Sequence, residues 1–218
     1  MNRIELKNLL PNVFRGAEKE PPVSLSELWL RDFAFEKGQT YLIVAESGTG
    51  KSSLCSYIYG NRHDYQGRIL FDGIDSRRNG IARWSEIRRR EIALLPQEMR
   101  LFPELTAMEN ILLKNNLTNH KTRAEIEEMM RRLEIADKID SPAAILSVGQ
   151  QQRVAIIRAL CQPFDFLILD EPVSHLDARN NATVAALAAE EAKEQGAAII
   201  ATSVGNHLSI DADVTIHL

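Results

Sequence analysis

A short glycine-containing segment between an apolar run and a helical pattern limits the folds open to this chain more than any other stretch. The segment Ala45–Ser52 reads AESGTGKS and continues the apolar run Tyr41–Ala45. Gly48 and Gly50 let the backbone curl so that successive N–H groups point at phosphate oxygens, and the N-terminus of the following helix favours anions. A strand before the loop and a helix after it are the context that a phosphate-binding loop requires. The sequence therefore predicts a phosphate-binding loop here.

Two residues of this loop have defined parts in binding a nucleoside triphosphate. Lys51 is expected to neutralise the β- and γ-phosphates of ATP, and the Ser52 hydroxyl is expected to ligate Mg²⁺. Ala45 stands at the first position, where glycine is usual. The alternative interpretation, a glycine-rich turn with a solvated lysine, is disfavoured by the strand and helix on either side. The residues expected to hold ATP are Ala45, Glu46, Ser47, Gly48, Thr49, Gly50, Lys51, Ser52 and Ser53.

A pair of carboxylates ends the apolar run Phe166–Leu169 and supplies further candidate residues. Asp170 and Glu171 follow that run directly. A carboxylate at the end of a strand beside the loop can hold Mg²⁺ through its water shell, which is the role expected of Asp170. Glu171 is expected to polarise the attacking water as a general base. Charged residues often end buried strands, so the pair gains its meaning from the phosphate-binding loop that accompanies it.

Short apolar runs separated by helical patterns predict an α/β fold with a parallel sheet covered on both faces. The runs expected to be its strands are Tyr41–Ala45, Ile92–Leu95, Phe166–Leu169, Ala197–Ala201 and Val214–Leu218. In the first forty residues, apolar and polar residues nearly alternate, which is typical of an antiparallel sheet. The strands expected in that second sheet are Arg3–Leu6, Ser26–Leu30, Phe33–Phe35 and Ile69–Phe71. The charged, proline-containing segment Glu18–Pro22 is expected to be a loop.

The stretch from Thr106 to Ala144 has no strand pattern and is expected to be helical. Its apolar residues recur at helical spacing, which predicts an inserted helical subdomain ending near Ser141-Pro142. A second helix is expected from about Gly149. The whole fold is then a P-loop NTPase core with a flanking antiparallel β subdomain and a helical insertion. We expect one domain over residues 1–218, with the antiparallel part at 1–40 and 61–75, the core at 41–60, 90–105 and 163–218, and the helical part at 106–162.

The segment Leu146–Arg153, which reads LSVGQQQR, resembles the signature of the ATP-binding cassette (ABC) transporter family, LSGGQ followed by QQR. The resemblance implies that Ser147, Gly149 and Gln150 grip the γ-phosphate of an ATP molecule bound to the opposite subunit of a dimer. Val148 replaces a family glycine and adds a β-branched side chain at that surface. Taken alone, the segment would read as an ordinary serine-capped helix.

Three further segments resemble the same family. Leu95-Pro96-Gln97 matches the glutamine loop, in which the Gln97 amide contacts Mg²⁺, and Ser174–Asp177 matches the loop that passes between subunits. Phe14 resembles the aromatic residue that stacks on adenine, but a lone phenylalanine is equally well explained as part of the core. The segment Trp84–Ile92, with the stretch that follows Gln97, looks most like the lipoprotein-releasing, macrolide-export and cell-division branch. Its three arginines can also be read as a solvated helix end.

One position departs clearly from the family. The histidine that senses the γ-phosphate is Ser203 in this chain, and the register is set by Ala212-Asp213, which falls where the family has the same pair. Ser203 can donate a hydrogen bond but carries no charge, so a catalytic contribution from it would be weaker. His207 comes four residues later and is interpreted as a surface histidine on a following helix.

Composition and apolar patterning restrict the partners that we expect. The net charge of −4 gives no reason to expect nucleic acid, and no apolar run reaches the ~18 to 20 residues that span a bilayer. The N-terminus does not read as a signal peptide, and no C-terminal regulatory domain is expected after the last predicted strand. Cys55 and Cys161 read as buried reduced thiols rather than metal ligands. The resemblance implies a cytoplasmic protein, attached to the inner face of the cell membrane through an integral-membrane permease.

These observations predict an ATPase that works as a dimer with itself or with a paralogous ABC subunit. Two ATP molecules bound between the subunits would close the dimer, and hydrolysis would reopen it and drive the permease. A hydrolysis-impaired nucleotide switch is the main alternative, because Val148 and Ser203 depart from the family. A role in DNA repair or on ribosomes is disfavoured, since this chain has neither a long coiled-coil insertion nor a second cassette. The transported substrate and the direction of transport depend on the permease.

Overall fold

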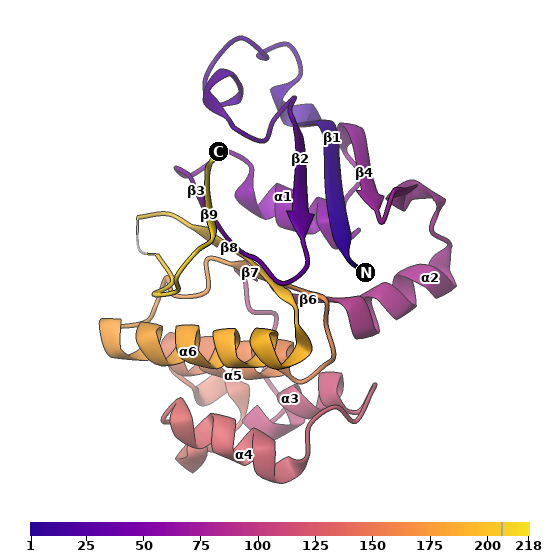
Figure 1. Ribbon diagram of the computed structural model, residues 1–218. Coiled ribbons are helices and arrows are strands. Elements are labelled where there is room, and N and C mark those ends of the chain that lie inside the picture. The colour runs from indigo at the N-terminus through magenta and orange to yellow at the C-terminus, as the bar shows by residue number, and fades with distance from the viewer. Residues whose placement is uncertain (206) are drawn as a thin grey trace.

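The computed structural model describes residues 1–205 and 207–218, arranged around two β-sheets with helix α1 between them (Figure 1). One sheet is antiparallel, with strand order β2-β1-β4-β5, and the other is parallel, with order β6-β7-β8-β3-β9. The strands are β1 (Arg3–Pro11), β2 (Asp32–Glu36), β3 (Thr40–Val44), β4 (Tyr65–Phe71), β5 (Ile74–Asp75), β6 (Ile92–Leu95), β7 (Phe166–Asp170), β8 (Ala198–Ser203) and β9 (Val214–His217). The α-helices are α1 (Lys51–Ile58), α2 (Ile81–Glu86), α3 (Ala107–Asn115), α4 (Arg123–Arg132), α5 (Val148–Leu160) and α6 (Ala178–Gln195).

The parallel sheet is buried on both faces, which explains the continuous apolar runs of its strands. In β7, Phe166 and Ile168 face a core shared with α1 and the antiparallel sheet. Leu167 and Leu169 face the opposite core, which is built with the helices α3 to α6. Figure 1 shows α5 and α6 beneath this sheet, with α3 and α4 farther from it. All five predicted strands of the parallel sheet are confirmed.

The antiparallel sheet contains three of its four predicted strands, but the strand expected at Ser26–Leu30 is wrong. The Ser26 hydroxyl accepts hydrogen bonds from the backbone N–H groups of Leu28 (3.0 Å) and Trp29 (2.8 Å). A serine side chain that captures nearby amides in this way stabilises a turn rather than a strand ladder. The turn buries Trp29 almost completely, so the apolar residues that suggested a strand are used for packing.

The region between Thr106 and Ala144 contains helices and no strand, as expected. Helix α4 ends at Arg132, and two 3₁₀ turns, η5 (Ala136–Lys138) and η6 (Ala143–Ile145), complete the segment. Helices α3, α4 and α5 each begin at a capping box, in which the N-cap side chain and the third helical residue exchange hydrogen bonds. Among the helices that the structure describes, none is long and apolar enough to cross a membrane.

Candidate functional site

The loop between β3 and α1 has the backbone conformation that its glycines make possible. Gly48 and Gly50 adopt positive φ angles of 85° and 100°. A Cβ on Gly50 would lie 2.9 Å from the Trp29 ring and 3.4 Å from the Phe14 ring, so only glycine fits there. The Trp29 indole N–H donates to the backbone oxygen of Thr49 (3.0 Å). Trp29 therefore packs against the loop at Gly50 and holds it through the hydrogen bond to Thr49. No sequence pattern indicated this role.

Lys51 lies inside the loop and is only 5% exposed. Its Nζ donates to the backbone oxygens of Glu46 (2.6 Å) and Ala45 (3.4 Å) and lies 3.8 Å from Oε1 of Glu171. Burial lowers the pKa of Lys51, and this effect outweighs the opposing attraction of Glu171 and Asp170. The ammonium group is thus desolvated and only partly compensated, which favours an arriving phosphate.

The hydroxyl, amide and carboxylate groups predicted for catalysis meet in one hydrogen-bonded chain. Ser52 Oγ donates to Oε1 of Gln97 (3.3 Å), and Nε2 of Gln97 donates to Oε2 of Glu171 (3.2 Å). Asp170 is buried and accepts a hydrogen bond from the Thr202 hydroxyl (2.8 Å). That hydroxyl also accepts from the backbone N–H of Glu171 (3.2 Å). Residues from four separate segments of the chain therefore converge beside the phosphate-binding loop.

The oxygen atoms of this cluster are of the kinds that Mg²⁺ prefers. Ser52 supplies a hydroxyl oxygen, Gln97 an amide oxygen and Asp170 a carboxylate oxygen. Small hard cations select oxygen ligands of this type and usually complete their shell with water and substrate phosphates. The three residues therefore fit a magnesium ion that arrives together with a nucleotide.

The signature segment begins α5 and presents its first residues to solvent. Ser147 is the N-cap: its Oγ accepts from the N–H of Gln150 (3.3 Å), and the Gln150 side chain accepts from the N–H of Ser147 (2.9 Å). Val148 is 49% exposed and Ile145 is also exposed beside it. A Cβ on Gly149 would approach the backbone oxygen of His175 to 3.3 Å, so the signature and the Ser174–Asp177 loop are in close contact.

Gln152, which was not among the predicted site residues, joins α5 to the backbone of Glu171. Its buried side chain donates to the backbone oxygen of Glu171 (3.3 Å) and accepts from the backbone N–H of His175 (3.3 Å). Glu171 has a positive φ of 51°, which is uncommon for a residue with a side chain. The hydrogen bonds from both sides help to hold that conformation.

The other predicted ATP contacts are placed as follows. Phe14 is partly buried, packs against the core that contains α1 and lies beside Gly50 of the loop. This position is compatible both with stacking on a base and with core packing, so its role stays a prediction. Ser53, in the first turn of α1, accepts a hydrogen bond from Arg62 (3.0 Å). The remaining loop residues lie between β3 and α1, as expected.

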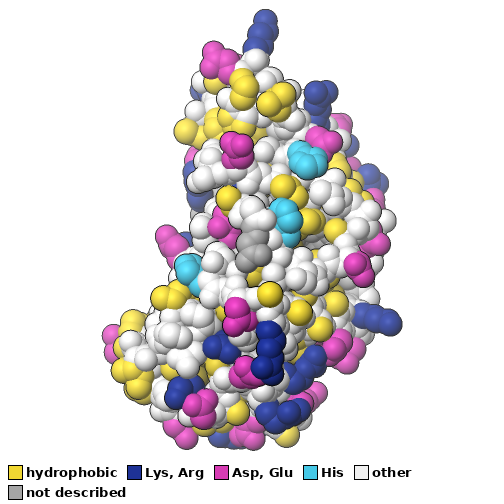
Figure 2. All heavy atoms as spheres, turned by 90° about the vertical axis from the view of Figure 1, so that its left-hand side faces the viewer, with side chains coloured by type: hydrophobic (Ala, Val, Ile, Leu, Met, Phe, Trp, Pro, Cys, Tyr) yellow, Lys and Arg dark blue, Asp and Glu magenta, His cyan; other side chains and the backbone are white. Residues whose placement is uncertain are grey.

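The structure gives His207 a different setting from the predicted one. It is exposed, as expected, but it lies in the loop between β8 and β9 and not on a helix. Its Nδ1 is 2.6 Å from the Oγ of Ser203, which is only 2% exposed. Figure 2 views the molecule from the side on which this loop and the N-terminal end of α6 lie in Figure 1, and histidine side chains reach the surface there.

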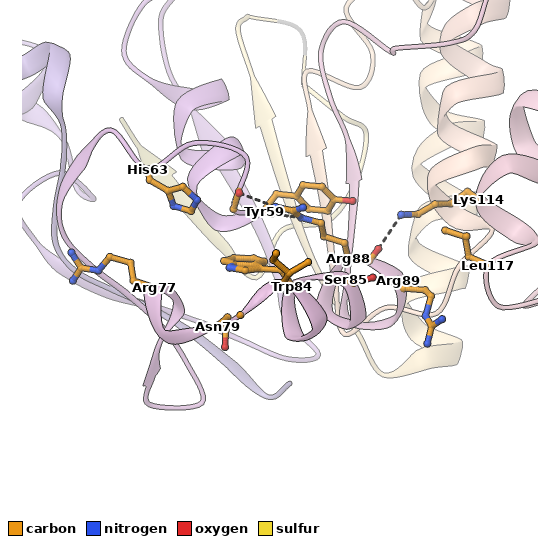
Figure 3. Close-up of a pocket in the computed structure, with 13 residues that line it drawn as sticks. Tyr59, His63, Arg77, Asn79, Trp84, Ser85, Arg88, Arg89, Lys114 and Leu117 are labelled. Atoms are coloured by element: carbon orange, nitrogen blue, oxygen red, sulfur yellow. Dashed lines mark hydrogen bonds between the residues drawn. The ribbon is translucent and has the colours of Figure 1, made fainter.

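A separate groove of about 880 Å³ lies between α2, the end of α1 and α3. Figure 3 shows Trp84 and Tyr59 in it, with Arg88 between them and Lys114 pointing in from α3. The Arg88 guanidinium lies 5.2 Å from the Trp84 ring centroid and 5.5 Å from that of Tyr59. Arg88 is therefore not the solvated helix end that its sequence context suggested; it lies in a π-helical turn, η4 (Ile87–Glu91), and stacks on aromatic rings.

Two cations of this groove, Arg88 and Lys114, are bonded to backbone oxygens, whereas Arg77 and Arg89 pair with carboxylates. Arg88 donates to the oxygens of Tyr59 (3.2 Å) and Gly60 (2.8 Å), and Lys114 donates to the oxygen of Arg88 (2.9 Å). Burial, reinforced by Arg158 and Arg88, lowers the pKa of Lys114 to about 8. The groove thus combines exposed apolar residues such as Ile81 with the positive charges of Arg88 and Lys114, whose hydrogen bonds go to neutral backbone oxygens.

Comparison with known proteins gives one consistent group of relatives. A sequence profile of the ABC transporter family matches residues 31–174. The lipoprotein-releasing system ATP-binding protein LolD of Shewanella frigidimarina is 31% identical over 185 residues, which cover 84% of this chain and 77% of the relative. An uncharacterized ABC transporter ATP-binding protein of Mycobacterium tuberculosis is 29% identical over 205 residues, which cover 93% of this chain and 61% of the relative.

Solved structures give the same picture at the level of the fold. The dimeric structure of MJ0796, a bacterial ABC transporter cassette, matches with a TM-score of 0.77 at 25% identity, over 92% of this chain and 87% of that one. This chain spans about three fifths of the mycobacterial relative's length.

Proposed function

This chain belongs to the ABC transporter family of ATP-binding proteins, and on that basis we propose that it is the ATP-hydrolysing motor subunit of a transporter. The observation that carries the proposal is the chain of hydrogen bonds from Ser52 through Gln97 to Glu171, with Lys51 3.8 Å from the same carboxylate. The site therefore brings together a carboxylate suited to activating water, a lysine suited to binding phosphate, and oxygen atoms suited to Mg²⁺. Phosphoryl transfer from ATP to water uses these three kinds of group.

The proposed reaction assigns one step to each group. Lys51 moves its hydrogen bonds from loop oxygens to the β- and γ-phosphates of ATP, and the N–H groups of the loop bind the same anion. Glu171 accepts a proton from water, whose oxygen bonds to the γ-phosphorus as the bond to the β–γ bridging oxygen breaks. The products are ADP and inorganic phosphate. Mg²⁺ held near Ser52, Gln97 and Asp170 would neutralise charge on the phosphates.

We also propose that the active form is a dimer in which Ser147 of each subunit contacts the ATP of the other. Ser147 is exposed at the N-terminus of α5, and its Oγ accepts from the N–H of Gln150 (3.3 Å) within that first turn, so the helix N-terminus faces solvent where an anion can approach it. The apolar residues Ile145 and Val148 beside it are exposed, and apolar surface of this kind is typically buried in an interface. Phe14 is proposed to stack on the adenine.

Replacing Ser147 by alanine is expected to lower ATP turnover by about tenfold or more, because one phosphate contact from the second subunit is lost. Thr122→Ala is the matched control, since Thr122 caps α4 with the same capping box and lies in the same helical region. Each change removes an N-cap and costs about 1 kcal/mol of stability. Steady-state phosphate release and light scattering with ATP or ADP would be measured for both. Equal turnover in the two variants would count against the dimer proposal.

The groove lined by Ile81, Trp84 and Lys114 is proposed as the docking surface for an integral-membrane permease. Its exposed apolar residues and the positive charges of Arg88 and Lys114 suit an amphipathic segment with acidic side chains. Docking there would place the protein on the inner face of the membrane. The groove adjoins α3 and the end of α1, so a movement of either element on nucleotide binding reaches it directly.

Replacing Ile81 by glutamate is expected to abolish binding to membranes from the source cells and to leave ATP turnover in solution unchanged. Ile81 is 92% exposed, so the change does not disturb packing; Ile74→Glu, at a residue 59% exposed on β5, is the control. Co-sedimentation with washed membranes would be measured before and after trypsin treatment of the membranes. Binding that survives trypsin would indicate lipid and would contradict docking to a permease.

A hydrolysis-impaired switch is the second candidate, because Ser203 carries no charge and is almost fully buried. The two candidates differ in one quantity, the ratio of ATP turnover in the wild-type protein to that in a variant without the Glu171 carboxylate. A ratio near one would favour the switch.

A further inference from the structure

The side chain of Ser203 is buried, but it contacts His207, whose side chain is exposed to solvent. Ser203 ends β8, and its Oγ lies 2.6 Å from Nδ1 of His207, whose side chain is exposed. The same serine is tied to the phosphate-binding loop, because its backbone oxygen accepts from the N–H of Ala45 (3.2 Å). The imidazole is therefore anchored directly to the strand end that borders the nucleotide site.

A second anchor comes from α6. The buried Asn181 side chain donates to the backbone oxygen of His207 (2.8 Å) and accepts from the backbone N–H of Ser209 (2.8 Å). Leu208, between them, is buried in the core beneath the parallel sheet. The described part of this loop is thus held at three points, and the position of the imidazole follows from them.

The residues that lead into this segment line the phosphate-binding loop itself. Val204 and Gly205 border a cavity of about 440 Å³ together with Ala45, Glu46 and Thr49. On the other side of β8, Thr202 bonds both to Asp170 and to the N–H of Glu171. The loop that carries His207 therefore starts between the phosphate-binding loop and the catalytic carboxylates.

We propose that His207 is a catalytic residue that donates a hydrogen bond to the γ-phosphate of ATP, with Ser203 and Asn181 as its positioning residues. When the Ser203 hydroxyl donates to Nδ1, the imidazole proton is on Nε2, so that nitrogen is a donor. Where the family has one histidine at position 203, this chain would use Ser203 and His207 together to contact the γ-phosphate. The inference rests on the proposed function, because it needs a nucleotide in the loop.

The contact is tested first without turnover, by nuclear magnetic resonance of ¹⁵N-labelled imidazoles in the full chain carrying Glu171→Gln. Mg-ATP is expected to shift the Nε2 signal of His207 and Mg-ADP is expected to leave it in place, because only ATP has a γ-phosphate. The same spectrum of a variant that also carries His207→Gln assigns the signal. Equal shifts with the two nucleotides, or no shift with either, would overturn the proposal.

Kinetics then separate catalysis from structure. His207→Ala is expected to lower kcat by about tenfold or more and to change KM for ATP by less than about twofold, since the lost bond acts on the transferring phosphoryl group. His207→Gln, whose amide N–H can take the place of Nε2–H, should recover part of the loss. Ser203→Ala should lower kcat by less than His207→Ala does, and the double variant should be no slower than His207→Ala alone. His120→Ala removes a histidine in the turn between α3 and α4 and is the control.

The outcomes distinguish this inference from the proposed function. If wild-type turnover equals that of the Glu171→Gln protein, the motor function is wrong, whereas the ATP-specific shift of the His207 signal still decides the contact. If wild-type turnover is high and His207→Ala matches it, the motor stands and the role of His207 is wrong. Additive losses in Ser203→Ala and His207→Ala would also contradict the pair.

Discussion

Replacing Glu171 by glutamine is expected to lower ATP turnover by about 10²- to 10⁴-fold, the range that removal of a general base produces. Glutamine has nearly the same shape and can still accept a hydrogen bond from Nε2 of Gln97, so the site keeps its geometry. It cannot accept a proton from water at neutral pH. ATP binding should therefore persist, and a closed dimer should accumulate because the step that opens it is blocked.

The measurement is phosphate release at saturating Mg-ATP, with light scattering to follow the dimer. Glu98→Gln makes the same change of carboxylate to amide on an exposed residue next to Gln97 and should turn over ATP like the wild-type protein. A Glu171→Gln protein that hydrolyses ATP as fast as the wild type would mean that another group activates the water.

Replacing Lys51 by methionine is expected to weaken ATP binding by about 10- to 100-fold, which corresponds to one charge-assisted hydrogen bond. The lysine is desolvated before any ligand arrives: it is 5% exposed, and burial lowers its pKa. A phosphate therefore gains a strong interaction without first removing water from the ammonium group. Methionine fills a similar volume, so the loop is expected to keep its shape.

Affinity would be measured by calorimetric titration of Mg-ATP in the Glu171→Gln background, where no nucleotide is consumed. Lys114→Met removes another partly buried lysine, located in the groove and away from the loop, and should leave the affinity unchanged. An affinity in Lys51→Met within about twofold of the parent would contradict the assigned role.

The sequence predicted well those elements whose residues have a single structural role that the local sequence pattern reports. The runs of β7 and β8 are apolar on both faces because helices and a second sheet cover them, and a continuous apolar pattern reports this directly. The loop at Ala45–Ser52 and the carboxylates that end β7 follow from a fixed local order of strand, loop and helix. Their meeting beside Gln97 could be anticipated, because the carboxyl ends of all strands in a parallel sheet lie at one edge. The sequence did not indicate that β8 separates β7 from β3.

The errors have a common cause, which is a side chain that bonds to a distant or unexpected partner. Ser26 turns the chain instead of continuing a strand, and Arg88 stacks on the rings of Tyr59, just after α1, and of Trp84 in α2. The setting of His207 depends on Ser203 and on Asn181 of α6, contacts that no spacing in the sequence reveals. Gln152 could have been found only by knowing that α5 lies against the end of β7.

The ion pair between Lys51 and Glu171 has a consequence for the order of events in the site. While no nucleotide is bound, the lysine that should bind phosphate and the carboxylate that should activate water partly neutralise each other. In the proposed mechanism, a triphosphate that draws Lys51 toward itself also releases Glu171 to act as a base. Substrate arrival and activation of the water would then be coupled in time, and Glu171 of an empty subunit would stay paired with Lys51.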